Sequence, residues 1–320
     1  MENKARIIQE VINQLGWKED ITQLIERVNQ LDKGLLQEDE FIYIIKWLGR
    51  CKFIHKLDQL HLPRESKNLY TIPDILVEVQ TSEGTKTFLV EIKTSKKDKL
   101  SWTEKYYEGL NNYSNLMNLP VLIAWKWDMF GIWTLFELKN FSKPESNYKI
   151  SFETAAKENL LSQIFGDFII MPDENFGLNI QMKKVKKISE GKKDNGNLEI
   201  GWETTIDEIY YSGRDNIKVT SMTKAIFALL TSLRTEEVVT ETETYITTKF
   251  FPNPQKMIFA QTLPTTLLRA FSKEDSINWL QCSLENKEPI SSSELLDGLT
   301  ENIEDGLIQH IFFTQPTSER

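Results

Sequence analysis

The side chains best suited to chemistry stand in two short apolar runs in the first half of the chain. Asp74 opens the first run, and Glu91 and Lys93 stand in the second. Side chains alternate along a strand, so Glu91 and Lys93 should share one face. Two hard carboxylate oxygens suit Mg²⁺, which takes its remaining ligands from water and a substrate phosphate. Because a nearby lysine can orient a water and offset charge on phosphorus, this trio predicts metal-dependent phosphodiester hydrolysis.

A β-hairpin is the element that would bring these side chains together. Both runs are rich in Val, Ile and Leu, and a polar turn at 82–84 separates them. Strands as apolar as these are expected at the centre of a sheet, where a carboxylate is rare unless it is paired or bound to a metal. The alternative is that the charges form only the solvated face of a half-buried sheet. Glu78, on the face of Asp74, is a further acidic candidate or a partner for Lys93 or Lys126.

The order Pro-Asp, a gap and then Glu-x-Lys resembles the PD-(D/E)xK nuclease superfamily. Its members include restriction endonucleases, archaeal Holliday-junction resolvases and transposon-end nucleases. A basic stretch at 96–99, a helical stretch at 102–117 and an apolar strand at 119–126 follow in the order expected of that core. The resemblance covers residues 37–140. It implies an α/β fold with a restriction-endonuclease-like core, in which helices flank a mixed central sheet.

The resemblance also implies roles for individual residues. Asp74 and Glu91 would hold Mg²⁺, for which Mn²⁺ can substitute, and the backbone carbonyl of Ile92 would add a ligand. Lys93 would position the attacking water and offset phosphate charge.

An acidic residue on the first core helix often contacts a metal-bound water in this superfamily. The expected helix at 37–49 offers Glu40 as the nearest match, with Glu38 and Asp39 as rivals. The alternative is that all three only complement the positive end of the helix dipole.

The charge distribution predicts local contacts with DNA rather than a basic surface. The net charge of −9 argues against a general nucleic-acid binder. Six lysines against one glutamate fill 183–193, which is either a phosphate-binding segment or a solvated turn between two strands. Trp102, Tyr106 and Tyr107 either touch the duplex or pack the helix that carries them. The lysines expected to contact DNA are Lys96, Lys97, Lys99, Lys126, Lys183, Lys184, Lys186 and Lys187.

The chain of 320 residues is long enough for two domains. Two amphipathic helices are expected in an N-terminal segment, 1–36, followed by the nuclease-like core at 37–150. Residues 151–320 are expected to form a second, α+β domain that selects the target, binds a partner protein or joins two copies in a homodimer. Its expected elements include a helix at 221–233 and a strand at 277–284.

Several other classes of protein are disfavoured. No run of eighteen apolar residues is present, so no membrane span is expected. The only cysteines, Cys51 and Cys282, form no zinc motif, and a reduced, cytoplasmic protein is the simplest interpretation. No glycine-rich phosphate loop indicates nucleotide hydrolysis.

These features predict a Mg²⁺-dependent DNA endonuclease. The resemblance suggests a role in prokaryotic restriction or in defence against foreign DNA. One alternative is a nuclease of transposon ends or branched DNA. Another is a catalytically silent DNA-binding or assembly protein that uses the same fold.

Overall fold

The computed structural model describes residues 37–61, 63–81, 83–192, 198–221, 235–252, 257–271 and 291–317. The expected N-terminal helices and the expected strand at 277–284 lie outside these ranges, as does nearly all of the expected helix at 221–233. The chain divides into two compact units, the first Met1–Asp167, Leu268–Pro289 and Phe313–Arg320, the second Phe168–Leu267 and Ile290–Phe312. Within the described residues, no helix has the length and apolar character needed to cross a membrane.

The first unit is built on a five-stranded mixed sheet. The sheet has the order β1-β2-β3-β5-β6, in which β3 and β5 run parallel and the other neighbours antiparallel. The strand that carries Glu91 and Lys93 is therefore central, and β2 and β3 form the expected hairpin. The strands are β1 (Cys51–Lys56), β2 (Ile75–Thr81), β3 (Gly84–Ser95), β5 (Val121–Trp127) and β6 (Ile132–Glu137).

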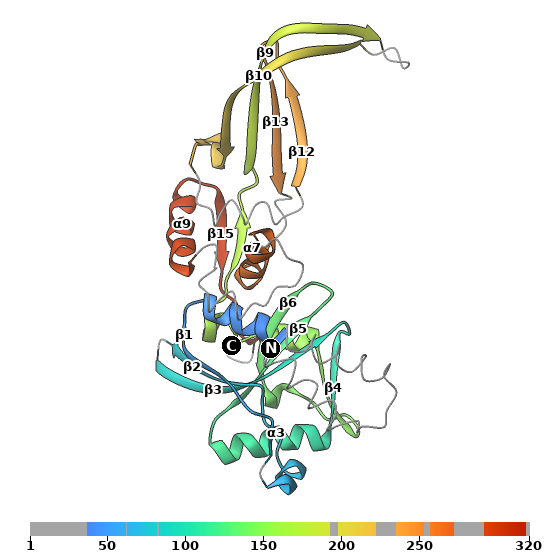
Figure 1. The fold of residues 1–320 in the computed structure, drawn as a ribbon, viewed down its shortest axis with the longest axis vertical. Helices are drawn as coiled ribbons and strands as arrows, with labels where there is room; N and C mark the ends of the chain where they lie inside the picture. The colour runs from blue at the N-terminus through green and yellow to red at the C-terminus, as the bar shows by residue number, and fades with distance from the viewer. Residues whose placement is uncertain are drawn as a thin grey trace. The chain divides into compact units, whose positions relative to one another are not determined.

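Helices cover both faces of this sheet. Helix 37–47 and α5 (Leu161–Phe165) pack on one face, where Val90 and Ile92 point. Helix α3 (Glu104–Met117) lies on the other side in Figure 1, on the face to which Leu89 points. Because neighbouring residues of β3 alternate between these two cores, Glu91 and Lys93 belong to the α3 side.

The start of α3 differs from the prediction of a helix from residue 102. Thr103 caps the helix by accepting a hydrogen bond from the Tyr106 N–H, so the helix begins at Glu104. The preceding residues form β4 (Lys99–Thr103), which pairs with β7 (Asn147–Ser151) and buries Trp102. The last residue of the basic stretch and the first residues of the predicted helix therefore belong to a strand, whose pairing partner lies far along the chain.

The first unit also extends further than the predicted boundary at 150–151. Helices α4 (Phe152–Lys157) and α5 follow β7, and Leu161 and Phe165 are fully buried in its core. The last described residues return to the same unit, where Thr317 Oγ1 donates to the Lys157 carbonyl at 3.1 Å. The boundary between the units is Asp167–Phe168 because α5 needs this sheet to bury its apolar side chains. The described part of the unit also contains two short 3-10 helices, Arg64–Asn68 and Leu138–Asn140.

The second unit contains a five-stranded antiparallel sheet of order β11-β10-β9-β13-β12. Strand β13 pairs only with 178–183 of β9, so the remainder of β9 and β10 continues as a two-stranded ribbon (Figure 1). The strands are β9 (Gly177–Lys192), β10 (Leu198–Ser212), β11 (Lys218–Val219), β12 (Thr235–Glu241) and β13 (Tyr245–Pro252). A three-stranded sheet joins β8 (Ile169–Pro172), β14 (Ile258–Phe259) and β15 (Ile308–Phe312). The described part of this unit also contains α9 (Ser292–Glu304), the first residues of α7 (Leu263–Phe271) and two 3-10 turns (Arg214–Asn216, Ala260–Thr262).

Candidate active site

The β2–β3 hairpin brings the three predicted residues together. Asp74 lies immediately before β2, and its Oδ2 accepts a hydrogen bond of 2.6 Å from the Ile92 N–H of β3. Lys93 Nζ forms an ion pair with Glu91 Oε1 and donates to the Ile92 carbonyl at 3.1 Å. The alternation expected of a strand thus places the carboxylate and the ammonium on one face.

A close approach between α3 and the segment entering β2 holds Asp74 in place. The Thr71 N–H donates to the Gly109 carbonyl of α3 at 3.0 Å. A Cβ atom at position 109 would lie 2.3 Å from Thr71 Oγ1, so only glycine permits this contact. On the other side, the Leu57 N–H donates to the Asp74 carbonyl at 2.9 Å. The backbone of Asp74 is therefore fixed by β1 and, through Thr71, by α3.

Burial gives Glu91 unusual electrostatics. The residue is only 2% exposed, and its Oε2 has no hydrogen-bond partner among the described residues. Burial, with the nearby charge of Asp74, raises the pKa of Glu91 to about 7. Burial alone would lower the pKa of Lys93, but the charges of Glu91 and Asp74 outweigh it and hold that pKa well above its usual range. Lys93 therefore stays positively charged.

The donor set fits a divalent cation that prefers oxygen. Among the described residues no three His, Cys, Asp or Glu side chains form a metal cage. Mg²⁺ does not require one, because it is usually bound through one or two carboxylates and keeps several waters. A cation beside Glu91 Oε2 would supply the partner that this buried oxygen lacks. The Ile92 carbonyl accepts one hydrogen bond and retains a second lone pair for a metal ligand.

Part of the chain matches a known nuclease family. Residues 65–167 match the family model of the archaeal Holliday junction resolvase. The resemblance to the PD-(D/E)xK nucleases is confirmed for this segment. The matched residues include Asp74, Glu91 and Lys93 but not helix 37–47 or the lysines of β9.

Several solved structures are similar to part of this chain. One of them is the 1.6 Å structure of Hjc from Archaeoglobus fulgidus, a Holliday junction resolvase from an archaeal hyperthermophile, with 18% sequence identity and a TM-score of 0.30. The similarity covers 38% of this chain and 87% of that chain. No curated protein matches the sequence.

Helix 37–47 places Glu38 where the charge of Asp74 acts on it. Burial and the neighbouring charge of Asp74 raise the pKa of Glu38 to about 7. Glu38 also lies 3.5 Å from Lys56 Nζ. The sequence names Glu38 only as a rival candidate, and the electrostatic influence of Asp74 makes it the better candidate on this helix.

Glu40 and Lys126 have a different environment from the one predicted. The two carboxylate oxygens of Glu40 accept from Lys126 Nζ at 2.6 and 2.7 Å, and Trp133 Nε1 donates to Glu40 at 3.2 Å. Lys126 is 8% exposed and Glu40 is 4% exposed. Since each charge is buried and satisfied by the other, this placement argues against a phosphate contact for Lys126 and against a metal-water contact for Glu40.

We expect Glu38 and Glu40 to give opposite results on substitution. Glu40→Gln should lower the free energy of unfolding by about 3 kcal/mol, because it leaves the charge of Lys126 buried without its partner. Glu38→Gln should keep the stability and slow cleavage. Urea unfolding and a cleavage assay on both variants measure the two effects. A stable, inactive Glu40→Gln variant would contradict the structural role given to Glu40 and the catalytic role given to Glu38.

The other predicted DNA contacts fall into two groups. Lys96, Lys97 and Lys99 are exposed directly after Lys93, at the passage from β3 into β4. The second group lies on β9 rather than on a turn. Two of these lysines are paired: Lys184 with Glu241 and Lys187 with Glu190, each at 2.5 Å. The other two, Lys183 and Lys186, are exposed, and no described carboxylate lies within ion-pair distance of them.

The aromatic residues of the α3 region do not share one role. Trp102 stacks on Phe141 with ring centroids 4.4 Å apart, and Tyr107 stacks on Tyr148, so both pack the structure. The Tyr106 hydroxyl instead donates to Glu91 Oε1. The sequence missed this contact, although the fully buried Leu110, one turn later, marks the face of α3 that points to the sheet.

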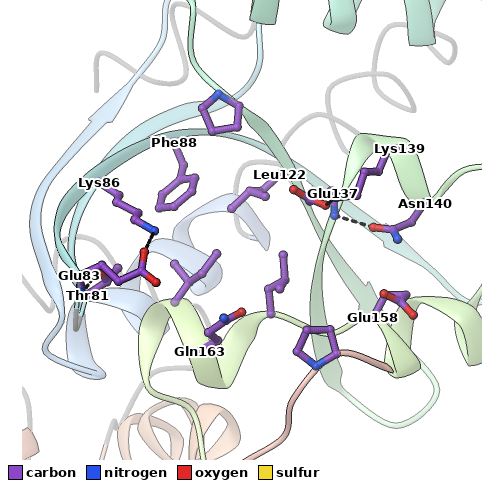
Figure 2. A pocket seen from close by; sticks show the side chains of 14 residues that line it. Thr81, Glu83, Lys86, Phe88, Leu122, Glu137, Lys139, Asn140, Glu158 and Gln163 are labelled. Atoms are coloured by element: carbon purple, nitrogen blue, oxygen red, sulfur yellow. Dashed lines mark hydrogen bonds and ion pairs between the residues drawn. The ribbon is translucent and has the colours of Figure 1, made fainter. Parts of the chain in front are cut away.

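A separate cavity of about 390 Å³ lies in the same unit and contains none of the predicted site residues (Figure 2). Phe88, Leu122 and Leu160 form part of its apolar lining. Lys86 points to Glu83 at its edge, where the two side chains form an ion pair. The described site residues therefore sit apart from this cavity.

Proposed function

We propose that the protein is a divalent-metal-dependent endonuclease that hydrolyses phosphodiester bonds in DNA. The observation that carries this proposal is the unpartnered, buried Oε2 of Glu91 beside Asp74 and Lys93. It lies within the segment that matches the resolvase family model. A silent DNA-binding or assembly role is disfavoured, because all three side chains are intact and adjacent.

Each side chain has a defined task in the proposed reaction. Asp74 and Glu91 hold the cation, and Glu38, on which the charge of Asp74 acts, orients a water bound beside it. A bound cation supplies Lewis-acid stabilisation of the phosphate charge. Lys93 keeps its proton, orients the attacking water and stabilises the negative charge that grows on the phosphate oxygens. Water attacks phosphorus in line, and the bond to the leaving oxygen breaks.

Branched DNA is the substrate class that the family match favours, because the matched model is that of a Holliday junction resolvase. The role in restriction or defence stays a prediction from the sequence, as do the cytoplasmic location and the contact of residues 151–320 with a second copy or a partner protein.

The test is cleavage of matched substrates by the full chain. A four-way junction, a linear duplex of the same strands and a single-stranded RNA are incubated with Mg²⁺, with Mn²⁺ or with excess chelator. We expect cleavage of DNA with either metal and none with chelator. Faster cleavage of the junction supports a branched-DNA nuclease, and equal cleavage of both DNA substrates supports a restriction-type endonuclease. No cleavage of any substrate in either metal contradicts the enzyme assignment.

The lysines of β9 give a prediction about binding rather than catalysis. Changing Lys183 and Lys186 to Gln should weaken DNA binding to the same extent for all sequences. It should also flatten the slope of log affinity against log salt by about 0.9 for each lost phosphate contact. The matched control is Lys187→Gln, because Lys187 already pairs with Glu190. Fluorescence anisotropy over a salt series measures both. An unchanged slope would show that this segment is only a solvated strand and makes no phosphate contacts.

A further inference from the structure

The two oxygens of the Glu91 carboxylate have unequal surroundings. Both protein donors, the Tyr106 hydroxyl and Lys93 Nζ, bind Oε1. Oε2 is buried and has no partner among the described residues. An isolated carboxylate can rotate and exchange its oxygens, but two donors on one oxygen fix which oxygen stays free.

Tyr106 is itself held firmly enough to impose this orientation. Its N–H donates to the side chain of Thr103, the residue that caps α3, at 3.3 Å. Its ring meets Trp102 edge-on with centroids 5.1 Å apart. Lys93 Nζ lies 5.7 Å from the centre of the same ring, so the tyrosine contacts both catalytic candidates on β3.

We propose that Tyr106 is a positioning residue that turns Glu91 so that Oε2 faces the cation. The inference rests on the proposed function, because the cation is the one that cleavage requires. Hydrogen bonds to a ligating carboxylate fix its orientation, and loss of such a bond lowers metal affinity or activity by about 10–100-fold. Tyr106 does not touch the substrate in this proposal, and it acts only through Glu91.

The test compares Tyr106→Phe with Tyr107→Phe in the full chain. The first substitution removes the hydroxyl and keeps the ring against Trp102 and Lys93. The second removes a hydroxyl of the same helix that donates to the Leu138 carbonyl at 3.3 Å, away from Glu91. Mn²⁺ binding in the absence of DNA, followed by electron paramagnetic resonance, should weaken by about 10–100-fold in Tyr106→Phe. It should stay at the wild-type value in Tyr107→Phe.

Cleavage provides a second readout that a purely structural role would not produce. In Tyr106→Phe the Mg²⁺ concentration for half-maximal cleavage should rise, and the rate at saturating Mg²⁺ should return towards wild type. Tyr106→Gln, whose amide can donate to Glu91, should bind Mn²⁺ more tightly than Tyr106→Phe.

Three results would overturn the inference. The first is wild-type Mn²⁺ affinity in Tyr106→Phe. The second is a rate that stays low at saturating Mg²⁺ with no change in the half-maximal concentration. The third result applies if Tyr106→Phe does not fold. In that case, a folded Tyr106→Gln variant that binds Mn²⁺ no more tightly than Glu91→Gln overturns the inference. Failure of the wild-type protein to bind Mn²⁺ would instead refute the metal site, and the proposed function with it.

Discussion

Replacing Asp74 or Glu91 with Ala is expected to abolish cleavage while the protein remains folded. The two carboxylates lie where a cation would bind, and loss of either removes a ligand oxygen on which charge stabilisation depends. A drop in the cleavage rate of at least about 100-fold is expected, the scale seen when one electrostatic contact to a transition state is lost. Lys93 is 32% exposed and can be rehydrated when Glu91 is removed, so cooperative unfolding should persist.

The matched control for these variants is Glu78→Ala. Glu78 lies on β2, four residues after Asp74 along the chain, and is only partly buried opposite Thr87 of β3. It should keep its cleavage rate. Full activity in Asp74→Ala or Glu91→Ala, or activity undiminished by excess chelator, would refute the metal site.

Lys93→Ala should lower turnover by about 10²–10³-fold and leave DNA affinity nearly unchanged, because Lys93 acts on charge that develops in the transition state. Lys93→Arg should also be impaired, since a planar guanidinium cannot replace a compact ammonium beside a metal-bound water. Single-turnover cleavage and equilibrium DNA binding, measured on the same preparations, separate the two effects.

Lys96→Ala is the control for Lys93, because Lys96 is an exposed lysine three positions further along the chain. It should weaken DNA binding slightly and leave the single-turnover rate intact. If Lys93→Ala instead loses DNA affinity with an unchanged rate, Lys93 is a phosphate-binding residue and its assigned role is wrong.

The hairpin was predictable from sequence because its determinants are local. The alternation of Glu91, Ile92 and Lys93 fixes the face of each side chain, and the polar turn fixes the pairing of β2 with β3. The mixed sheet and the helix after β4 follow from the same order of apolar runs. The placement of Asp74 beside Ile92 needed only this register.

The choice between Glu38 and Glu40 was not predictable because it depends on contacts between distant residues. Lys126 is 86 residues from Glu40 along the chain and forms the ion pair that stabilises this buried carboxylate. Helix spacing alone places several acids near the same end of the helix. Likewise, β4 needs β7 as its partner, and the position of α5 in the first unit depends on the apolar surface of the sheet.

At the proposed metal site, the raised pKa values of Glu38 and Glu91 would couple metal uptake to proton release. Near pH 7 each carboxyl is partly protonated in the metal-free protein, and a cation must displace that proton before it binds. Metal affinity should therefore fall as the pH drops below about 7. The proton helps to hold the empty site together, since a carboxyl with a raised pKa stabilises the fold below its unfolded pKa and loses that contribution as the pH rises through the folded value. Proton and metal would thus act as alternative counter-ions for these carboxylates, and the heat of metal binding should vary with the ionisation enthalpy of the buffer.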